Sequence, residues 1–143
     1  MRTPHPAPDA KSRGGMSDAP PLQGDLQTEL MRVLWEQGAG TVEDVRSALP
    51  DGHQGAYTTV QTVLNRLAER GLLERERQGR SLLYRPLVSE AQYLSSSLRR
   101  ALGAASSGAK TAALAEILGS LEGSELDEVR RRAGAIDRQR GRR

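Results

Sequence analysis

At 143 residues with 36% hydrophobic content, the chain has room for one modest core and some further chain beyond it. It contains no cysteine, which excludes disulfides and thiolate metal sites, and its two histidines, His5 and His53, lie far apart with no third imidazole. No apolar run approaches the roughly 18 residues needed to cross a bilayer, and the N-terminus lacks an apolar secretory core. We therefore expect a cytoplasmic protein with no membrane insertion, no metal and no cofactor.

The net charge of +3 is distributed unevenly along the chain. Residues 22–52 contain two basic and six acidic side chains, for a net charge of −4. Residues 53–85 contain six arginines and three acidic side chains, for a net charge of +3. This uneven charge suits a protein that binds a polyanion through one basic face, while the rest of its surface stays free in solvent.

The first 21 residues are rich in Pro, Ala, Gly and Ser and have no periodic apolar positions. Such a segment cannot offset the entropy of ordering, so we predict a disordered arm over residues 1–21. Met16 is a second candidate start within this arm.

Two helices are expected next. From Leu22, apolar residues recur at spacings of three and four, which predicts a first helix that ends at Gly38. Thr41 with Asp44 is close to a capping box and predicts a second, short helix that ends before Pro50.

A third helix is predicted by the buried stripe of Val60, Val63, Leu64 and Leu67, with Gly71 placed just after its end. Its opposite face carries hydroxyls and amides, where a face selected only for solubility would more often carry Glu, Lys and Arg. Hydroxyl and amide side chains both donate and accept hydrogen bonds, which suits them to reading base edges. The side chains expected to contact DNA are Tyr57, Thr58, Thr59, Gln61, Thr62, Asn65 and Arg66. A merely solvated face is the alternative.

Two alternating runs on either side of Gly79 predict a β-hairpin that is closed by Pro86. The two-residue period of a strand sends the arginines of the first run to one face and its glutamates to the other. The hairpin residues expected to contact DNA are Arg75, Arg77, Gln78 and Arg80. A salt-bridged surface ribbon is the alternative.

The remaining chain is helical and differently composed. Ser89 with Gln92 predicts a cap for a fourth helix, "GAASSG" reads as a linker, and Ser124 with Asp127 is expected to cap the last helix. The apolar stripes of these helices exceed what the small core can cover, so a second copy is expected to bury them. The expected dimerisation residues are Tyr93, Leu94, Leu98, Leu102, Leu114, Ile117, Leu118, Leu121, Leu126 and Val129.

Three helices followed by a basic hairpin is the element order of a winged helix, whose second and third helices form a helix-turn-helix. We therefore predict a mainly α-helical protein with a small β-hairpin. Residues 22–88 form a winged helix-turn-helix DNA-binding domain, residues 89–136 a helical dimerisation domain, and residues 137–143 a basic tail that is solvated or adds phosphate contacts. The third helix would enter the major groove while the hairpin arginines meet phosphates or the minor groove.

The stretches "MRVLWEQGAGTVEDVRSAL" and "AYTTVQTVLNRLAERGLLERERQGRSLLYRPLVS" closely resemble the penicillinase and methicillin-resistance repressors, the BlaI/MecI/CopY family. The resemblance covers roughly residues 22–136, and "TTVQTVLNRL" with the "YRPLVS" hairpin exit carries most of it. It implies a homodimeric winged-helix repressor on a dyad-symmetric double-stranded DNA operator. It also implies release when a membrane-bound sensor protease detects β-lactam and triggers cleavage. The DNA-contacting positions of the family match Thr58, Thr59, Gln61, Thr62 and Arg66.

The sequence departs from the family pattern in three places. Ala56 and Tyr57 stand where many relatives have Ser-Pro at the start of the recognition helix, which affects base preference there. The chain has no Phe, so the Asn-Phe cleavage site of some relatives is absent. It also lacks the cysteine-rich tail of the copper-responsive relatives, which argues against copper release.

An enzyme and a protein-binding adaptor fit this sequence less well than a DNA-binding protein. Two scattered histidines and no cysteine supply no catalytic set, and no Gly-rich phosphate loop is present, so we expect no catalytic residues. A winged-helix adaptor that binds protein instead of specific DNA is the alternative, although 3% aromatic content offers few anchors for a protein interface.

Overall fold

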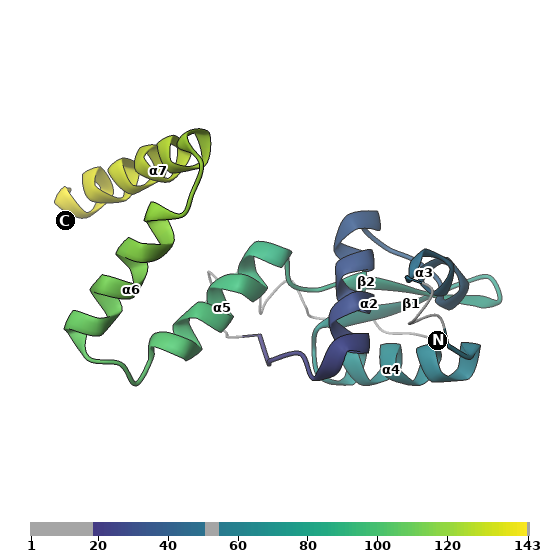
Figure 1. Ribbon diagram of the computed structural model, residues 1–143. Helices are drawn as coiled ribbons and strands as arrows, with labels where there is room; N and C mark the ends of the chain where they lie inside the picture. Colours follow the sequence, from purple (N-terminus) through teal and green to yellow (C-terminus); the bar gives the residue numbers. More distant parts are fainter. Residues whose placement is uncertain (1–18, 51–54, 143) are drawn as a thin grey trace. The chain divides into compact units, whose positions relative to one another are not determined.

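The computed structural model describes residues 19–50 and 55–142. Figure 1 shows the elements in chain order: α2 (Gly24–Gln37), α3 (Val42–Ala48), α4 (Tyr57–Glu69), β1 (Leu73–Gln78), β2 (Ser81–Pro86), α5 (Glu90–Leu102), α6 (Ser107–Gly119) and α7 (Gly123–Gly141). The chain divides into two compact units between Arg100 and Ala101. Three helices followed by a hairpin and then by further helices confirm the predicted class, a winged helix-turn-helix with a helical region after it. Within the described ranges, no helix is both long and apolar enough to cross a membrane.

The helix ends of the first unit follow local chemistry. Gly38 ends α2 with φ of 89°, and its N–H donates to the Leu34 carbonyl at 2.7 Å. Thr41 and Asp44 form the reciprocal capping box that starts α3, with both hydrogen bonds at 3.1 Å. Gly71 follows the C-cap of α4 with φ of 85°, a conformation that costs glycine little.

The core lies where α2, α3, α4 and the hairpin meet. It contains the predicted stripe of α4, in which Val60, Leu64 and Leu67 have no exposed surface, while Val63 packs against the core from its edge. Tyr84 of β2 is also fully buried. Truncating one of these leucines would remove about 2–5 kcal/mol of stability, so this cluster fixes where α4 lies.

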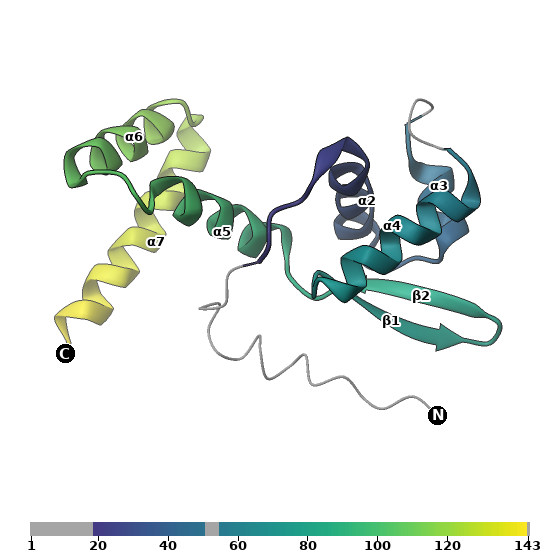
Figure 2. The same cartoon turned by 90° about the horizontal axis from the view of Figure 1, so that it is seen from below.

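The two strands form an antiparallel ribbon in which Arg75 pairs with Tyr84 and Gln78 pairs with Ser81. Figure 2 shows the hairpin extending from the three helices, with its turn at the free end. A further pairing joins the base of the ribbon to the segment before α3: Gly40 and Tyr84 exchange backbone hydrogen bonds of 2.9 and 2.8 Å. A Cβ at Gly40 would lie 3.2 Å from a methyl of Val45, so the close approach favours glycine. No local sequence pattern predicts this bridge.

The expected disordered arm over residues 1–21 is wrong at its C-terminal end, while residues 1–18, with Met16, lie outside the described residues. Ala19 is 4% exposed, and its N–H donates to the Ser96 hydroxyl of α5 at 3.1 Å. Arg100 donates to the Ala19 carbonyl. Arg70, at the end of α4, donates to the Pro21 carbonyl at 2.6 Å. Residues 19–22 therefore form a strap that ties α5 to the recognition part of the unit.

The strap predicts a stability effect at Ser96, whose side chain is only 2% exposed. In Ser96→Ala, the buried Ala19 N–H loses its acceptor, so the free energy of unfolding should fall by about 1–3 kcal/mol in urea titrations. Ser97→Ala is the matched control, because that hydroxyl only accepts a long 3.3 Å bond from Arg100 near solvent. Equal stability of the two variants would show that the bond from Ala19 to Ser96 does not stabilise the fold.

The strap also moves the expected domain boundary. The division was expected after Val88, but the unit continues to Arg100 because α5 is held by the strap. The Leu22 N–H donates to the Tyr93 hydroxyl at 2.8 Å, and the Tyr93 and Trp35 rings lie 5.7 Å apart. The predicted Ser89–Gln92 cap of α5 is confirmed by hydrogen bonds of 2.8 and 3.0 Å.

Two expectations for the second unit are wrong. The predicted "GAASSG" linker is shorter, since the Ser106 hydroxyl caps α6 and the helix begins at Ser107. The cap of α7 is the box of Glu122 with Glu125 instead of Ser124 with Asp127: the Glu122 N–H donates to the Glu125 carboxylate at 3.0 Å, and the helix already begins at Gly123. The basic tail over residues 137–143 stays a prediction; its residues are helical as far as Gly141, and those as far as Arg142 are exposed.

Candidate nucleic-acid interface

The outward face of α4 has the character that the sequence predicted. Tyr57, Thr58, Thr59, Thr62 and Arg66 are exposed, and Gln61 and Asn65 are half-buried. Residues three and four apart on a helix share a face, so Thr58, Gln61, Thr62 and Asn65 form one polar row. Within the part of the chain that the structure describes, no side chain caps the start of α4, where Ala56 is the N-cap, so its first N–H groups can bind water or a phosphate.

The hairpin, hereafter the wing, separates its charges by face as predicted. Arg75 and Arg77 share one face, where they pair with Tyr84 and Leu82. Glu76 lies on the other face and forms an ion pair of 3.5 Å with Arg85. Gln78 ends β1 and Arg80 follows Gly79 in the turn, and both side chains are exposed. The wing therefore presents arginines on one face and at its tip, and no carboxylate among the described residues forms an ion pair with them.

One polar node joins the wing to α4. The Oδ1 atom of Asn65 accepts hydrogen bonds from Arg75 Nη1 at 3.0 Å and from the Tyr84 hydroxyl at 2.7 Å. Burial raises the pKa of the Tyr84 hydroxyl, although the nearby charge of Arg75 opposes the shift. The hydroxyl therefore stays protonated near neutral pH and acts as a donor. Both Asn65 and Arg75 were predicted to face DNA, and neither was expected to bind the other.

Known proteins are similar to this chain in sequence. The penicillinase repressor family matches residues 23–134. The chain belongs to that family. It is a DNA-binding transcriptional repressor of the BlaI type and not an enzyme.

Individual relatives cover much of this repressor. The transcriptional regulator BlaI of Mycobacterium tuberculosis is 34% identical over 122 residues, which span 84% of this chain and 88% of the relative. The penicillinase repressor of Bacillus licheniformis is 30% identical over 74 residues, 52% of this chain and 58% of the relative.

Two solved structures resemble the winged-helix part of this repressor. The solution structure of the DNA-binding domain of the repressor BlaI has 29% identity and a TM-score of 0.46, and it spans 55% of this chain and 94% of that one. The monomeric form of Bacillus licheniformis BlaI in complex with the blaP half-operator has 30% identity and a TM-score of 0.43, over 51% of this chain and 89% of that one.

The residues predicted for dimerisation fall into two groups in this repressor. Tyr93 packs against the core of its own chain and accepts a hydrogen bond from the strap, so it stabilises the first unit. Exposed apolar side chains are Leu94 and Leu98 on α5, Leu114, Ile117 and Leu118 on α6, and Val129 on α7, while Leu102, Leu121 and Leu126 are half-buried. No side chain of α6 or α7 is fully buried within the chain.

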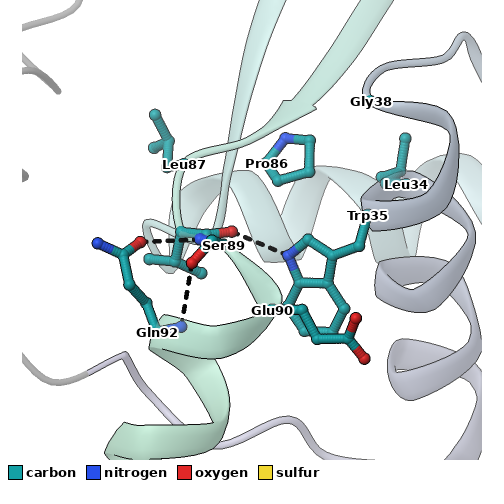
Figure 3. A pocket seen from close by; sticks show the side chains of 9 residues that line it. Leu34, Trp35, Gly38, Pro86, Leu87, Ser89, Glu90 and Gln92 are labelled. Carbon is teal, nitrogen blue, oxygen red and sulfur yellow. Dashed lines mark hydrogen bonds between the residues drawn. The ribbon is translucent and has the colours of Figure 1, made fainter. Parts of the chain in front are cut away.

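A pocket of about 410 Å³ lies where the wing leads into α5 (Figure 3). It is lined by Leu34, Trp35, Gly38, Pro86, Leu87, Val88, Ser89, Glu90 and Gln92. The hydrogen bonds drawn there join lining residues to one another: the Trp35 indole N–H donates to the Val88 carbonyl at 2.8 Å, and Ser89 and Gln92 cap each other. These bonds fix the path of the chain from the wing into α5, and Trp35 packs against the core from its edge.

Proposed function

We propose that this repressor acts as a homodimer on a dyad-symmetric operator, with α4 of each copy in the major groove. The observation that carries the proposal is the polar row on α4, which lies beside a wing with Arg75 and Arg77 on one face and Arg80 at its tip. A helix-turn-helix places its second helix in the major groove, while basic side chains nearby meet phosphates. The complex of a 30% identical BlaI with a half-operator supports the same mode of binding.

The two parts of the interface have different roles in this proposal. Thr58, Gln61 and Thr62 of the polar row read base edges, together with the exposed Thr59 beside the row and Tyr57 at the start of the helix. Arg66 on α4 and Arg77, Gln78 and Arg80 on the wing contact phosphates or the adjacent minor groove. Phosphate contacts set register and affinity, whereas base contacts set sequence preference.

The homodimer is supported by the apolar side chains that the chain leaves uncovered. Ile117 is 45% exposed and Leu98 is also 45% exposed, in helices too short to be stable alone in water. Leu114, Ile117 and Leu118 follow the three- and four-residue spacing of one helix face. A second copy of the same helices would cover these side chains and link two recognition helices on one duplex.

Repression is steric in this proposal: the dimer covers a promoter in the cytoplasm and excludes polymerase. The family resemblance assigns release to an antibiotic or cell-envelope signal that a membrane-bound sensor protease converts into cleavage. Because the chain has no Phe, any such cleavage uses a bond other than Asn-Phe.

Selection from a randomised DNA pool tests this function directly. Duplexes recovered by the full-length protein should contain an inverted repeat whose half-sites lie about one or two helical turns apart. Recovery of no enriched duplex would reject sequence-specific DNA binding, and enrichment of single half-sites alone would reject the dimeric operator.

The wing tip provides a prediction about salt dependence. Arg80→Ala should reduce the slope of log affinity against log salt by about 0.9 per subunit, because one phosphate contact is lost. The loss should be similar on the selected duplex and on random DNA. Arg85→Ala is the matched control, since that guanidinium pairs with Glu76 on the opposite face. An unchanged slope in fluorescence-anisotropy titrations of Arg80→Ala would remove the tip from the phosphate contacts.

A further inference from the structure

Asn65 lies where the wing joins α4, and both of its acceptor positions are occupied. Its Oδ1 accepts from Arg75 Nη1 at 3.0 Å and from the Tyr84 hydroxyl at 2.7 Å. These two donors face each other across β1 and β2. An amide oxygen offers two lone pairs, so neither is left for a third donor.

The same contacts fix which way the amide is turned. Arginine can only donate, so the oxygen of Asn65 must face Arg75 and the nitrogen must point elsewhere. Among residues 19–50 and 55–142, no acceptor takes a hydrogen from Asn65 Nδ2. Asn65 follows Gln61 and Thr62 on the outward row of α4 and is only half-buried, so its two N–H donors can meet a ligand of that face.

An asparagine that identifies adenine uses both ends of its amide: it donates to N7 and accepts from the N6 amino group. Asn65 cannot accept. We infer that Asn65 positions the wing through Arg75 and Tyr84, and that it meets DNA only as a hydrogen-bond donor to an acceptor atom of a base or phosphate. The inference rests on the proposed placement of α4 in the major groove.

Gln61 provides the contrast on the same row. No hydrogen bond joins its side chain to another described residue, so both ends of its amide are available. One turn of α4 thus presents two amides with different recognition properties. Gln61 can form the paired contact with adenine, and Asn65 can satisfy an acceptor only.

The first experiment uses the full-length protein and the duplex that it selects from a randomised pool. Each adenine is replaced in turn by purine, which lacks the N6 amino group, and affinities of wild type and Asn65→Ala are compared by fluorescence anisotropy. The wild-type advantage over Asn65→Ala, about 10-fold for a good polar contact, should be unchanged at every adenine. A single adenine whose replacement abolishes this advantage would overturn the inference.

A second set of duplexes distinguishes the two sources of an acceptor. Each base is replaced by an analogue that lacks one acceptor, namely N7 of a purine, O6 of guanine or O4 of thymine. Loss of the wild-type advantage at one such position identifies a base contact, and a uniform advantage at all positions and on random DNA identifies a phosphate contact. Either result agrees with a donor-only amide. If wild type selects no duplex at all, the proposed function fails and the inference fails with it.

The melting temperature and DNA affinity of the Asn65→Asp variant test separately whether Asn65 positions the wing. The carboxylate can still accept from Arg75 and Tyr84, so this variant should keep the melting temperature of wild type, whereas Asn65→Ala should melt lower. The affinity of Asn65→Asp for the selected duplex should nevertheless fall at least about 10-fold, because this substitution replaces the N–H donors by a negative charge beside a polyanion. An Asn65→Asp protein that melts as low as Asn65→Ala, or that binds the duplex as wild type does, would contradict the assignment.

Discussion

A chain that ends at Arg100 is expected to bind a duplex containing two half-sites about 10²–10⁴-fold more weakly than the full-length repressor. Linking two recognition helices makes the second half-site contact intramolecular, and this gain in effective concentration is lost without the linking helices. The truncation removes α6, α7 and the turn between them. Seven large apolar side chains in this segment are exposed or half-buried: Leu114, Ile117, Leu118, Leu121, Leu126, Val129 and Ile136. It keeps the contacts of Ser96 and Arg100 with the strap, so the first unit should still fold.

The control for this truncation is a duplex with one half-site. Full-length and truncated proteins should bind it with similar affinity, because no second contact is available. Melting curves of the truncated protein should show a cooperative transition for the first unit. An undiminished affinity for the two-half-site duplex would contradict the dimer role of the C-terminal helices.

Gln61→Ala is expected to cost about 1–3 kcal/mol of binding free energy on the selected duplex and little on random DNA. Gln61 lies on the outward row of α4, and no described residue binds its amide, so a base edge is its natural partner. The discrimination arises because the wrong base leaves one end of the amide without a partner.

Gln37→Ala is the matched control, since that glutamine is exposed at the end of α2 and outside the row. It should bind both kinds of DNA as wild type does. Equal losses on selected and random duplexes for Gln61→Ala would reassign Gln61 from base recognition to general DNA contact.

Local patterns were sufficient to predict the winged helix. The stripe of Val60, Leu64 and Leu67, the capping box at Thr41 and the glycine at the wing turn all act over a few residues, and each is found where expected. The polar row of α4 was equally visible, because a helix face with so many hydroxyls and amides departs from ordinary solvated composition.

Contacts between distant residues could not be predicted in this way. Ala19 is ordered by its hydrogen bond to the Ser96 hydroxyl, 77 residues away, and the composition of a Pro- and Ala-rich segment does not predict that partner. The bond from Tyr84 to Asn65 spans 19 residues and depends on how the wing packs on α4. The start of α7 was misplaced for a different reason: Ser is the commoner cap, but the helix begins before Ser124, where Glu122 and Glu125 form a capping box.

Hydroxyl-radical footprinting of the selected duplex, bound by the full-length protein, distinguishes a symmetric dimer from other modes of DNA binding. A homodimer with α4 in the major groove and the wing on the neighbouring backbone should protect two patches related by a dyad. The centres of these patches should lie about one or two helical turns apart. One unsymmetrical patch, or protection that does not depend on sequence, would exclude a homodimer bound to the operator through α4 and the wing.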